Sequence, residues 1–248
     1  MKGVILAAGV ASRLRPLTDS RPKCLLEIGG KTILGLTLEN LAAERITDIV
    51  IVTGYREDQI RRFVGEQFPA LNVAFVTNER YETTNNSYSL WLTRDAVAGD
   101  GIVLLDSDIV FDRRILHLLI DAPAEDCLAM VGGTPLADEE IKLKLGPGHS
   151  VLRIGKDVPP AEAAGESIGI EKMSAAFMAQ LYAALDRLIV DRKTVTLFYE
   201  AAFQDVIEGG RAMTAIDVGT TPCIEIDTPD DLAVARTIGA FAGTPARP

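Results

Sequence analysis

A glycine-containing loop near the start of the chain carries the first residues whose types and spacing suit chemistry. An apolar run passes into this loop at Leu6, Ala7, Ala8 and Gly9. The cations Arg13 and Lys23 follow a short distance along the chain. Small residues let backbone N–H groups approach an anion closely, and the two cations can neutralise its charge. Because the loop directly follows a strand-like run, we expect it to hold a nucleoside triphosphate at the carboxyl end of a sheet.

Two aspartates form a second candidate site, for a metal ion. Asp108 comes just after the apolar run 101–105, and Asp227 closes the tripeptide Glu-Ile-Asp. Carboxylates at strand ends beside a phosphate loop suit Mg²⁺, a hard cation that takes oxygen ligands. Asp106 is the weaker candidate, because it can instead structure the turn. A helix cap or a turn is the alternative role for Asp108 and Asp227.

A polar segment, YETTNNSYSL at residues 81–90, offers groups that can read a nucleotide base. Adjacent amides at Asn85 and Asn86 present donors and acceptors to a base edge, and Ser89 adds a hydroxyl. The alternative is structural, since Asn-Asn also forms an ordinary Asx turn and caps a helix.

A fourth group of residues suits a cationic acceptor. Aromatic faces beside a carboxylate, as in TLFYE at residues 196–200, attract an ammonium through cation–π interactions. The alternative places the aromatic residues in the core of a helix, and leaves the lysines on a solvated surface. The candidate acceptor-binding residues are Lys142, Lys156, Glu166, Phe198, Tyr199 and Glu200, with Glu171 beside them.

Alternating buried strands and amphipathic helices must position these residues. Short apolar runs bounded by glycine or polar residues predict parallel strands, and apolar residues at helical spacing predict the connecting helices. This order predicts a doubly wound sheet with right-handed crossovers. Gly146-Pro147-Gly148 predicts a hairpin between two further strands. The expected strands are 2–7, 49–52, 73–76 and 101–105, the expected helices 32–44, 57–68, 174–191 and 198–208.

We therefore expect one α/β domain over residues 1–248. Its nucleotide-binding half would span 1–133, and its acceptor-binding half 134–240. The fold class expected is a doubly wound, Rossmann-like, mostly parallel sheet, elaborated by a hairpin and helices around the acceptor.

Composition excludes several other classes of protein. The chain has 248 residues, of which 48% are hydrophobic, so it can bury a large core. A formal net charge of -10 makes a nucleic-acid partner improbable. No apolar run reaches the ~18–20 residues of a membrane span. The three cysteines fit neither a zinc pattern nor a disulfide framework, so we expect reduced thiols and a cytoplasmic protein.

The opening motif also carries a resemblance. LAAGVASRLRPLT at residues 6–18, followed by RPK at 21–23, resembles the signature of nucleotidyltransferases that join a nucleoside triphosphate to a phosphorylated small molecule. The segment 81–90 is similar to that of the bacterial cytidylyltransferases acting on phosphocholine or phosphonates. This resemblance implies the nucleotide-diphospho-sugar transferase type of fold. It also implies Mg²⁺ at Asp108 and Asp227, with Arg13 and Lys23 stabilising the departing pyrophosphate.

The resemblance implies CTP as the nucleotide and an acceptor such as phosphocholine, phosphoethanolamine or 2-aminoethylphosphonate. A sugar 1-phosphate or inositol phosphate remains the enzymatic alternative. A non-catalytic nucleotide-binding module is the alternative from another class. A homodimer is compatible with the sequence, and no nucleic-acid or membrane partner is expected.

Overall fold

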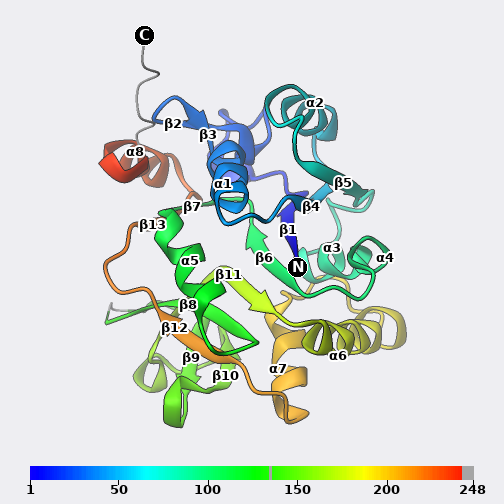
Figure 1. Ribbon diagram of the computed structural model, residues 1–248, viewed down its shortest axis with the longest axis vertical. Coiled ribbons are helices and arrows are strands. Elements are labelled where there is room, and N and C mark those ends of the chain that lie inside the picture. Colours follow the sequence, from blue (N-terminus) through cyan, green and yellow to red (C-terminus); the bar gives the residue numbers. More distant parts are fainter. Residues whose placement is uncertain (134–135, 242–248) are drawn as a thin grey trace.

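The computed structural model describes residues 1–133 and 136–241, and shows a central sheet with helices on both faces (Figure 1). The strands of this sheet are β1 (Lys2–Ala7), β4 (Asp48–Thr53), β5 (Asn72–Thr77), β6 (Ile102–Asp106), β8 (Cys127–Gly132), β9 (Lys142–Leu145), β10 (Val151–Gly155), β11 (Gly165–Met173) and β12 (Thr214–Asp217). Within the described ranges, seven of them follow the order β10-β9-β11-β6-β1-β4-β5, while β8 pairs with β11 and with β12.

Helices cover both faces because side chains alternate along each strand. The helices are α1 (Ile33–Ala43), α2 (Glu57–Gln67), α3 (Asn86–Leu92), α4 (Arg94–Val97), α5 (Arg113–Asp121), α6 (Ala175–Asp186), α7 (Glu200–Glu208) and α8 (Pro229–Thr237). In β1, Val4 and Leu6 point to a core shared with α3, α6 and α7. Ile5 and Ala7 point to the opposite core, shared with α1, α2 and α5.

Strand β1 marks the point where the strand order reverses. It pairs in parallel with β4 on one side and with β6 on the other, so that Leu6 lies opposite both Val52 and Asp106. In open α/β sheets, ligands bind at the carboxyl ends of the strands at such a switch point. The opening loop and the residues after β6 therefore meet where a ligand is expected.

The second half of the sheet is built around β11 and is antiparallel except for the parallel pair of β8 and β12. Strand β11 pairs antiparallel with β6, β8 and β9, and its register breaks between Ser167 and Glu171. Gly169 lies in this break with φ +67°, and a Cβ there would lie 2.8 Å from Asp106 Oδ2. Only glycine fits both the backbone conformation and the close approach.

A small ribbon places the segment that contains Asp227 beside β6. Strand β13 (Cys223–Glu225) pairs antiparallel with β7 (Ile109–Phe111), and the N–H of Ile226 donates to the carbonyl of Asp108 at 2.9 Å. Helix α8 then begins with a capping box between Thr228 and Asp231. A separate pair, β2 (Glu27–Ile28) and β3 (Lys31–Thr32), lies near α8 (Figure 1).

The expected α/β class, parallel core strands and hairpin are confirmed. The helix expected over 174–191 is shorter, because a π-helical turn (Arg187–Asp191) follows α6. The helix expected from 198 begins at Glu200. The expected boundary between the two halves falls at residue 134, outside the described residues. Across the ranges 1–133 and 136–241, no helix combines the length and apolarity needed to cross a bilayer.

Candidate active site

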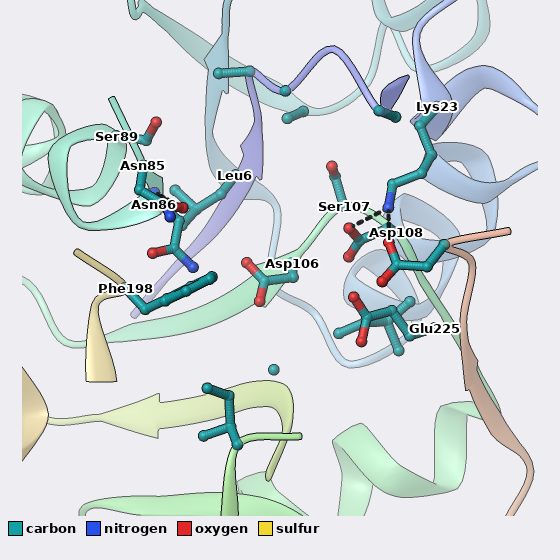
Figure 2. A pocket seen from close by; sticks show the side chains of 18 of the residues that line it. Leu6, Lys23, Asn85, Asn86, Ser89, Asp106, Ser107, Asp108, Phe198 and Glu225 are labelled. Atoms are coloured by element: carbon teal, nitrogen blue, oxygen red, sulfur yellow. Dashed lines mark hydrogen bonds and ion pairs between the residues drawn. The ribbon is translucent and has the colours of Figure 1, made fainter. Parts of the chain in front are cut away.

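A cavity of about 590 Å³ opens at the switch point and brings most of the predicted site residues together. In Figure 2, Asn85, Asn86 and Ser89 lie on one side, Lys23, Asp108 and Glu225 on the other, and Asp106 between them. Two predicted residues, Lys142 and Tyr199, are not part of its lining. The predicted residues that line it are Leu6, Ala7, Ala8, Gly9, Arg13, Lys23, Asn85, Asn86, Ser89, Asp108, Lys156, Glu166, Phe198, Glu200 and Asp227.

The opening loop is held in place by contacts outside the cavity. The carbonyl of Ala8 accepts from the N–H of Tyr55 at 3.0 Å, and Thr18 Oγ1 donates to the carbonyl of Ala11 at 3.0 Å. Ala11 itself adopts a left-handed conformation with φ 52°. At Gly9, by contrast, no described atom lies within 4 Å of the position a Cβ would take. The loop is therefore fixed on its outer side and leaves room over Gly9 inside the cavity.

Lys23 joins the two candidate metal-binding aspartates. Its Nζ lies 2.7 Å from Asp108 Oδ2 and 2.9 Å from Asp227 Oδ1, and the lysine side chain is only 13% exposed. Burial alone would lower the pKa of Lys23, but the attraction and hydrogen bonds of the two carboxylates outweigh it and raise that pKa. Arg13, which is largely exposed, pairs with Asp227 at 2.6 Å. Both predicted cations thus converge on the predicted acids.

Glu225 is a member of the acidic cluster that sequence reasoning missed. Oxygen atoms of Asp108, Glu225 and Asp227 all lie within 4.8 Å of one another. The sequence could have indicated Glu225, because side chains alternate along a strand and residues 225 and 227 therefore lie on the same side. Burial, together with the negative charges of Asp108 and Asp227, raises the pKa of Glu225 to about 8. The three carboxylates form an all-oxygen donor set of the kind that hard divalent cations take.

Several polar side chains of the segment 85–89 form hydrogen bonds to the backbone. Asn85 is the N-cap of α3, its Oδ1 accepting from the N–H of Asn86 at 2.8 Å, so the capping alternative holds for this residue. Asn86 Oδ1 accepts from the N–H of Tyr199 at 2.9 Å, and Ser87 Oγ donates to the carbonyl of Leu197 at 2.6 Å. The start of α3 is therefore bonded to the segment 195–199.

Other polar groups of the same segment face the cavity. Ser89 Oγ accepts from Asn78 Nδ2 at 3.0 Å, and both residues line the cavity although they are almost fully buried. Asn78 was not predicted, because a lone asparagine after a strand carries no distinctive pattern. The Asn78 side chain also donates to Thr84 Oγ1, so hydrogen bonds fix the polar groups on this side of the cavity.

The acceptor side differs from the sequence-based expectation in two residues. Tyr199 is fully buried, and its hydroxyl donates to Asp106 Oδ2 at 2.9 Å, so its ring does not face the cavity. Lys142 is 1% exposed, and its ammonium donates to the carbonyls of residues 137, 138 and 140. The lysine therefore anchors its own loop. Both side chains were misplaced because neither their burial nor these contacts can be read from local sequence.

Phe198, Lys156 and Glu139 form a chain of contacts along the cavity wall. The Nζ of Lys156 lies 4.8 Å from the ring centroid of Phe198 and 2.9 Å from Glu139 Oε2. The Lys156 ammonium thus already occupies a face of the exposed phenyl ring, where cation–π attraction is favourable.

A buried acidic group lies behind this part of the cavity. Burial raises the pKa of Glu200 to about 7. Burial, then the charges of Asp106 and Glu200, raises the pKa of Glu171 well above its usual range. Among the described residues, neither carboxylate oxygen of Glu171 has a hydrogen-bond partner. This part of the site is thus rich in acid and short of compensating positive charge.

Similarity to known proteins agrees with the position of the opening loop and the carboxylates at the switch point of the sheet. A profile of the nucleotidyl transferase family matches residues 2–140, more than half of the chain. The chain belongs to the nucleotidyl transferase family. It is a nucleotidyltransferase, and the resemblance of the opening motif to this superfamily is confirmed.

Some curated relatives of the chain are cytidylyl-transferring enzymes by name, and others are mannose-1-phosphate guanyltransferases. The chain is 30% identical to the CTP:phosphoglutamine cytidylyltransferase of Campylobacter jejuni, across 94% of this chain and 98% of that protein. It is 28% identical to the CMP-5'-(3-aminopropyl)phosphonate synthase of Streptomyces rubellomurinus, across 93% of this chain. The chain spans only 37% of the length of the latter enzyme.

Solved structures confirm the fold. The CTP:phosphocholine cytidylyltransferase from Streptococcus pneumoniae superposes with a TM-score of 0.78 at 24% identity, covering 95% of this chain and 97% of that one. At this level of identity the likeness shows the fold.

Proposed function

We propose that this nucleotidyltransferase is a Mg²⁺-dependent cytidylyltransferase that transfers CMP from CTP to a small phosphorylated or phosphonate amino alcohol. The observation that carries the proposal is one cavity lined by the glycine loop, the Lys23–Asp108–Asp227 cluster and the carboxyl groups of Glu166 and Glu200. The 30% identity to an enzyme named as a CTP-dependent cytidylyltransferase supports CTP. Phosphoethanolamine, 2-aminoethylphosphonate and phosphocholine are the acceptors that fit such a cavity.

The reaction needs no nucleophilic side chain. An oxygen of the acceptor phosphate, already ionised at neutral pH, attacks the α-phosphorus of CTP in line. The new P–O bond forms as the bond to the β-phosphate oxygen breaks, and pyrophosphate departs with the electron pair. Arg13 and Lys23, which lie at the acidic cluster, would stabilise this charge, while the backbone around Gly9 would position the triphosphate.

The acidic cluster is the proposed metal-binding site. Asp108 and Asp227 would hold Mg²⁺, and Glu225 completes an oxygen donor set with them. Bound there, the ion would neutralise charge on the triphosphate and help orient the reacting groups.

The base-binding residues are proposed from the wall that Asn85, Asn86 and Ser89 form. The Nδ2 group of Asn86 and the Ser89 hydroxyl offer hydrogen bonds to a base edge, whereas the Oδ1 atoms of both asparagines bond to backbone N–H groups. Replacing Asn86 by aspartate keeps the acceptor for Tyr199 and removes the amide donors. We expect this variant to fold and to lose affinity for CTP.

A substrate matrix tests the proposal. Four nucleoside triphosphates are each combined with choline-, ethanolamine-, phosphonate- and sugar-type phosphates in the presence of Mg²⁺, and pyrophosphate release is measured. CTP with an amino-alcohol phosphate or phosphonate should be the best pair. A best pair of UTP or dTTP with a sugar phosphate would contradict the proposal, and no release with any pair would favour a non-catalytic binding module.

A further inference from the structure

The acceptor side of the cavity contains buried oxygen atoms that lack hydrogen-bond partners. We call Glu140, Glu166, Ser167 and Glu200 the acidic wall, because all four line the cavity. Glu200 is 6% exposed and Ser167 is 8% exposed. Among residues 1–133 and 136–241, no group bonds to Glu200 Oε2, Glu140 Oε2 or Ser167 Oγ. Because a buried acceptor without a donor is costly, these oxygens indicate a ligand that supplies N–H or O–H groups.

The aromatic groups near the wall do not form a cage for a cation. Phe198 lines the cavity, but the Nζ of Lys156 lies 4.8 Å from its ring centroid. Tyr199 is fully buried, and its hydroxyl is bonded to Asp106. A quaternary ammonium, which has no N–H group, depends on free aromatic faces. This wall offers carboxylate and hydroxyl oxygens in their place.

A ligand cation would also stabilise the ionised form of the acidic groups behind the wall, which burial disfavours. Glu171 is fully buried next to Tyr199 and Asp106, and none of the described side chains forms an ion pair with it. Lys156, whose positive charge acts on Glu200, is itself paired with Glu139. A ligand that brings both positive charge and several N–H groups therefore matches the wall in charge and in hydrogen bonding.

Resting on the proposed cytidylyltransferase function, we infer that the acceptor carries a primary ammonium group, which donates to Glu200 and Ser167 of the acidic wall. The three N–H groups of such an ammonium match the unpaired oxygens, whereas a trimethylammonium leaves them unpaired. Acceptors of the ethanolamine or aminoalkylphosphonate class are then the substrates, and phosphocholine is discriminated against.

A methylation series of one acceptor tests this inference. Phosphoethanolamine and its N-methyl, N,N-dimethyl and N,N,N-trimethyl (phosphocholine) derivatives are compared at saturating CTP and Mg²⁺. Since sites built for N–H donors reject analogues that lack them, we expect kcat/KM to fall with each methyl group, by roughly 100-fold or more overall. Equal or higher kcat/KM for phosphocholine would overturn the inference and leave the proposed function standing. If CTP reacted with none of these four acceptors and not with 2-aminoethylphosphonate either, both the inference and the proposed function would be overturned.

Two variants connect this preference to the wall. Ser167→Ala removes one small acceptor, and we expect KM for phosphoethanolamine to rise about tenfold while the kinetics with phosphocholine barely change. Glu200→Gln keeps the shape and removes the charge, and should lose most of the preference for the primary amine. Glu162→Gln is the matched control, because Glu162 is exposed and pairs with Lys144 away from the cavity. A full preference retained in both wall variants would overturn the inference.

Discussion

Replacing Lys23 by methionine is expected to damage both the stability and the catalysis of the protein. The ammonium makes two contacts, at 2.7 and 2.9 Å, with carboxylates that are about three-quarters buried. At an effective dielectric constant of about 20, each contact corresponds to a gross attraction of roughly 6 kcal/mol, most of which offsets the cost of desolvation. Removing one partner of a buried pair costs about 3–5 kcal/mol, and the partial exposure of both aspartates favours the lower end of that range.

The catalytic loss follows from the same position. If Lys23 stabilises the charge on departing pyrophosphate, its removal should lower kcat about 100-fold to 1,000-fold, as for other groups that stabilise charge in a transition state. The two effects are separated by urea unfolding of the free protein and by pyrophosphate release at saturating substrates. Adding Mg²⁺ should restore more stability to the variant than to the unmodified protein, because a second cation then neutralises the carboxylates.

Lys31→Met is the matched control for this experiment. Lys31 pairs with Glu39 at the same 2.7 Å, but both side chains are more than one-third exposed. Exposed pairs contribute only about 0–1 kcal/mol, so this variant should unfold and turn over almost normally. An equal loss of stability in the two variants would refute the claim that burial makes the contacts of Lys23 more important than those of Lys31. A normal kcat in Lys23→Met would refute the catalytic role of Lys23.

Three further predictions concern other parts of the site. Gly9→Ala should raise KM for CTP by roughly 10-fold to 100-fold without loss of stability, because its methyl group enters the open space of the loop; Gly65→Ala, on α2 with equally open surroundings, should leave KM unchanged. Between pH 4.5 and about 7 the folded protein holds the proton of Glu200 more tightly than the unfolded chain does, so the unfolding free energy should fall by about 3 kcal/mol as pH rises. Glu200→Gln should remove this contribution, so that the fall in unfolding free energy between pH 5 and pH 8, measured by urea unfolding, becomes smaller although Glu225 and Glu171 still contribute. An unchanged fall would contradict the assigned pKa of Glu200. Asp108→Asn should lower Mg²⁺ affinity in calorimetry and kcat by about 100-fold or more, whereas retained turnover would remove Asp108 from the metal site.

The features predictable from sequence were those that depend on chain direction and periodicity. Two buried strands end just before Gly9 and Asp108, which implies that both residues lie at one edge of the sheet. The structure places both residues in one cavity. The signature at residues 6–23 also identified the family.

Features that depend on pairing between distant segments were not predictable. The burial of Tyr199 is set by the hydrogen bond to Asp106, more than 90 residues away, and Lys142 is saturated by the carbonyls of its own loop. Glu225 joins the acidic cluster because β13 pairs with β7. Such contacts follow from strand register in three dimensions, and local sequence contains no record of it.

Hydrogen bonds join the start of α3 to the segment 195–199, so the segments proposed to bind the base and the acceptor form one structural unit. Asn85 is bonded directly to this segment, because its backbone N–H donates to the carbonyl of Val195 and its Nδ2 donates to the carbonyl of Thr196. Asn86 accepts from the N–H of Tyr199. If residues 195–200 were replaced by those of a relative with another acceptor, the hydrogen bonds of Asn85 and Asn86 would be disturbed. The start of α3 would therefore have to be transplanted with them. Acceptor and nucleotide preference in this scaffold should then be exchanged together, as a pair of segments, rather than one at a time.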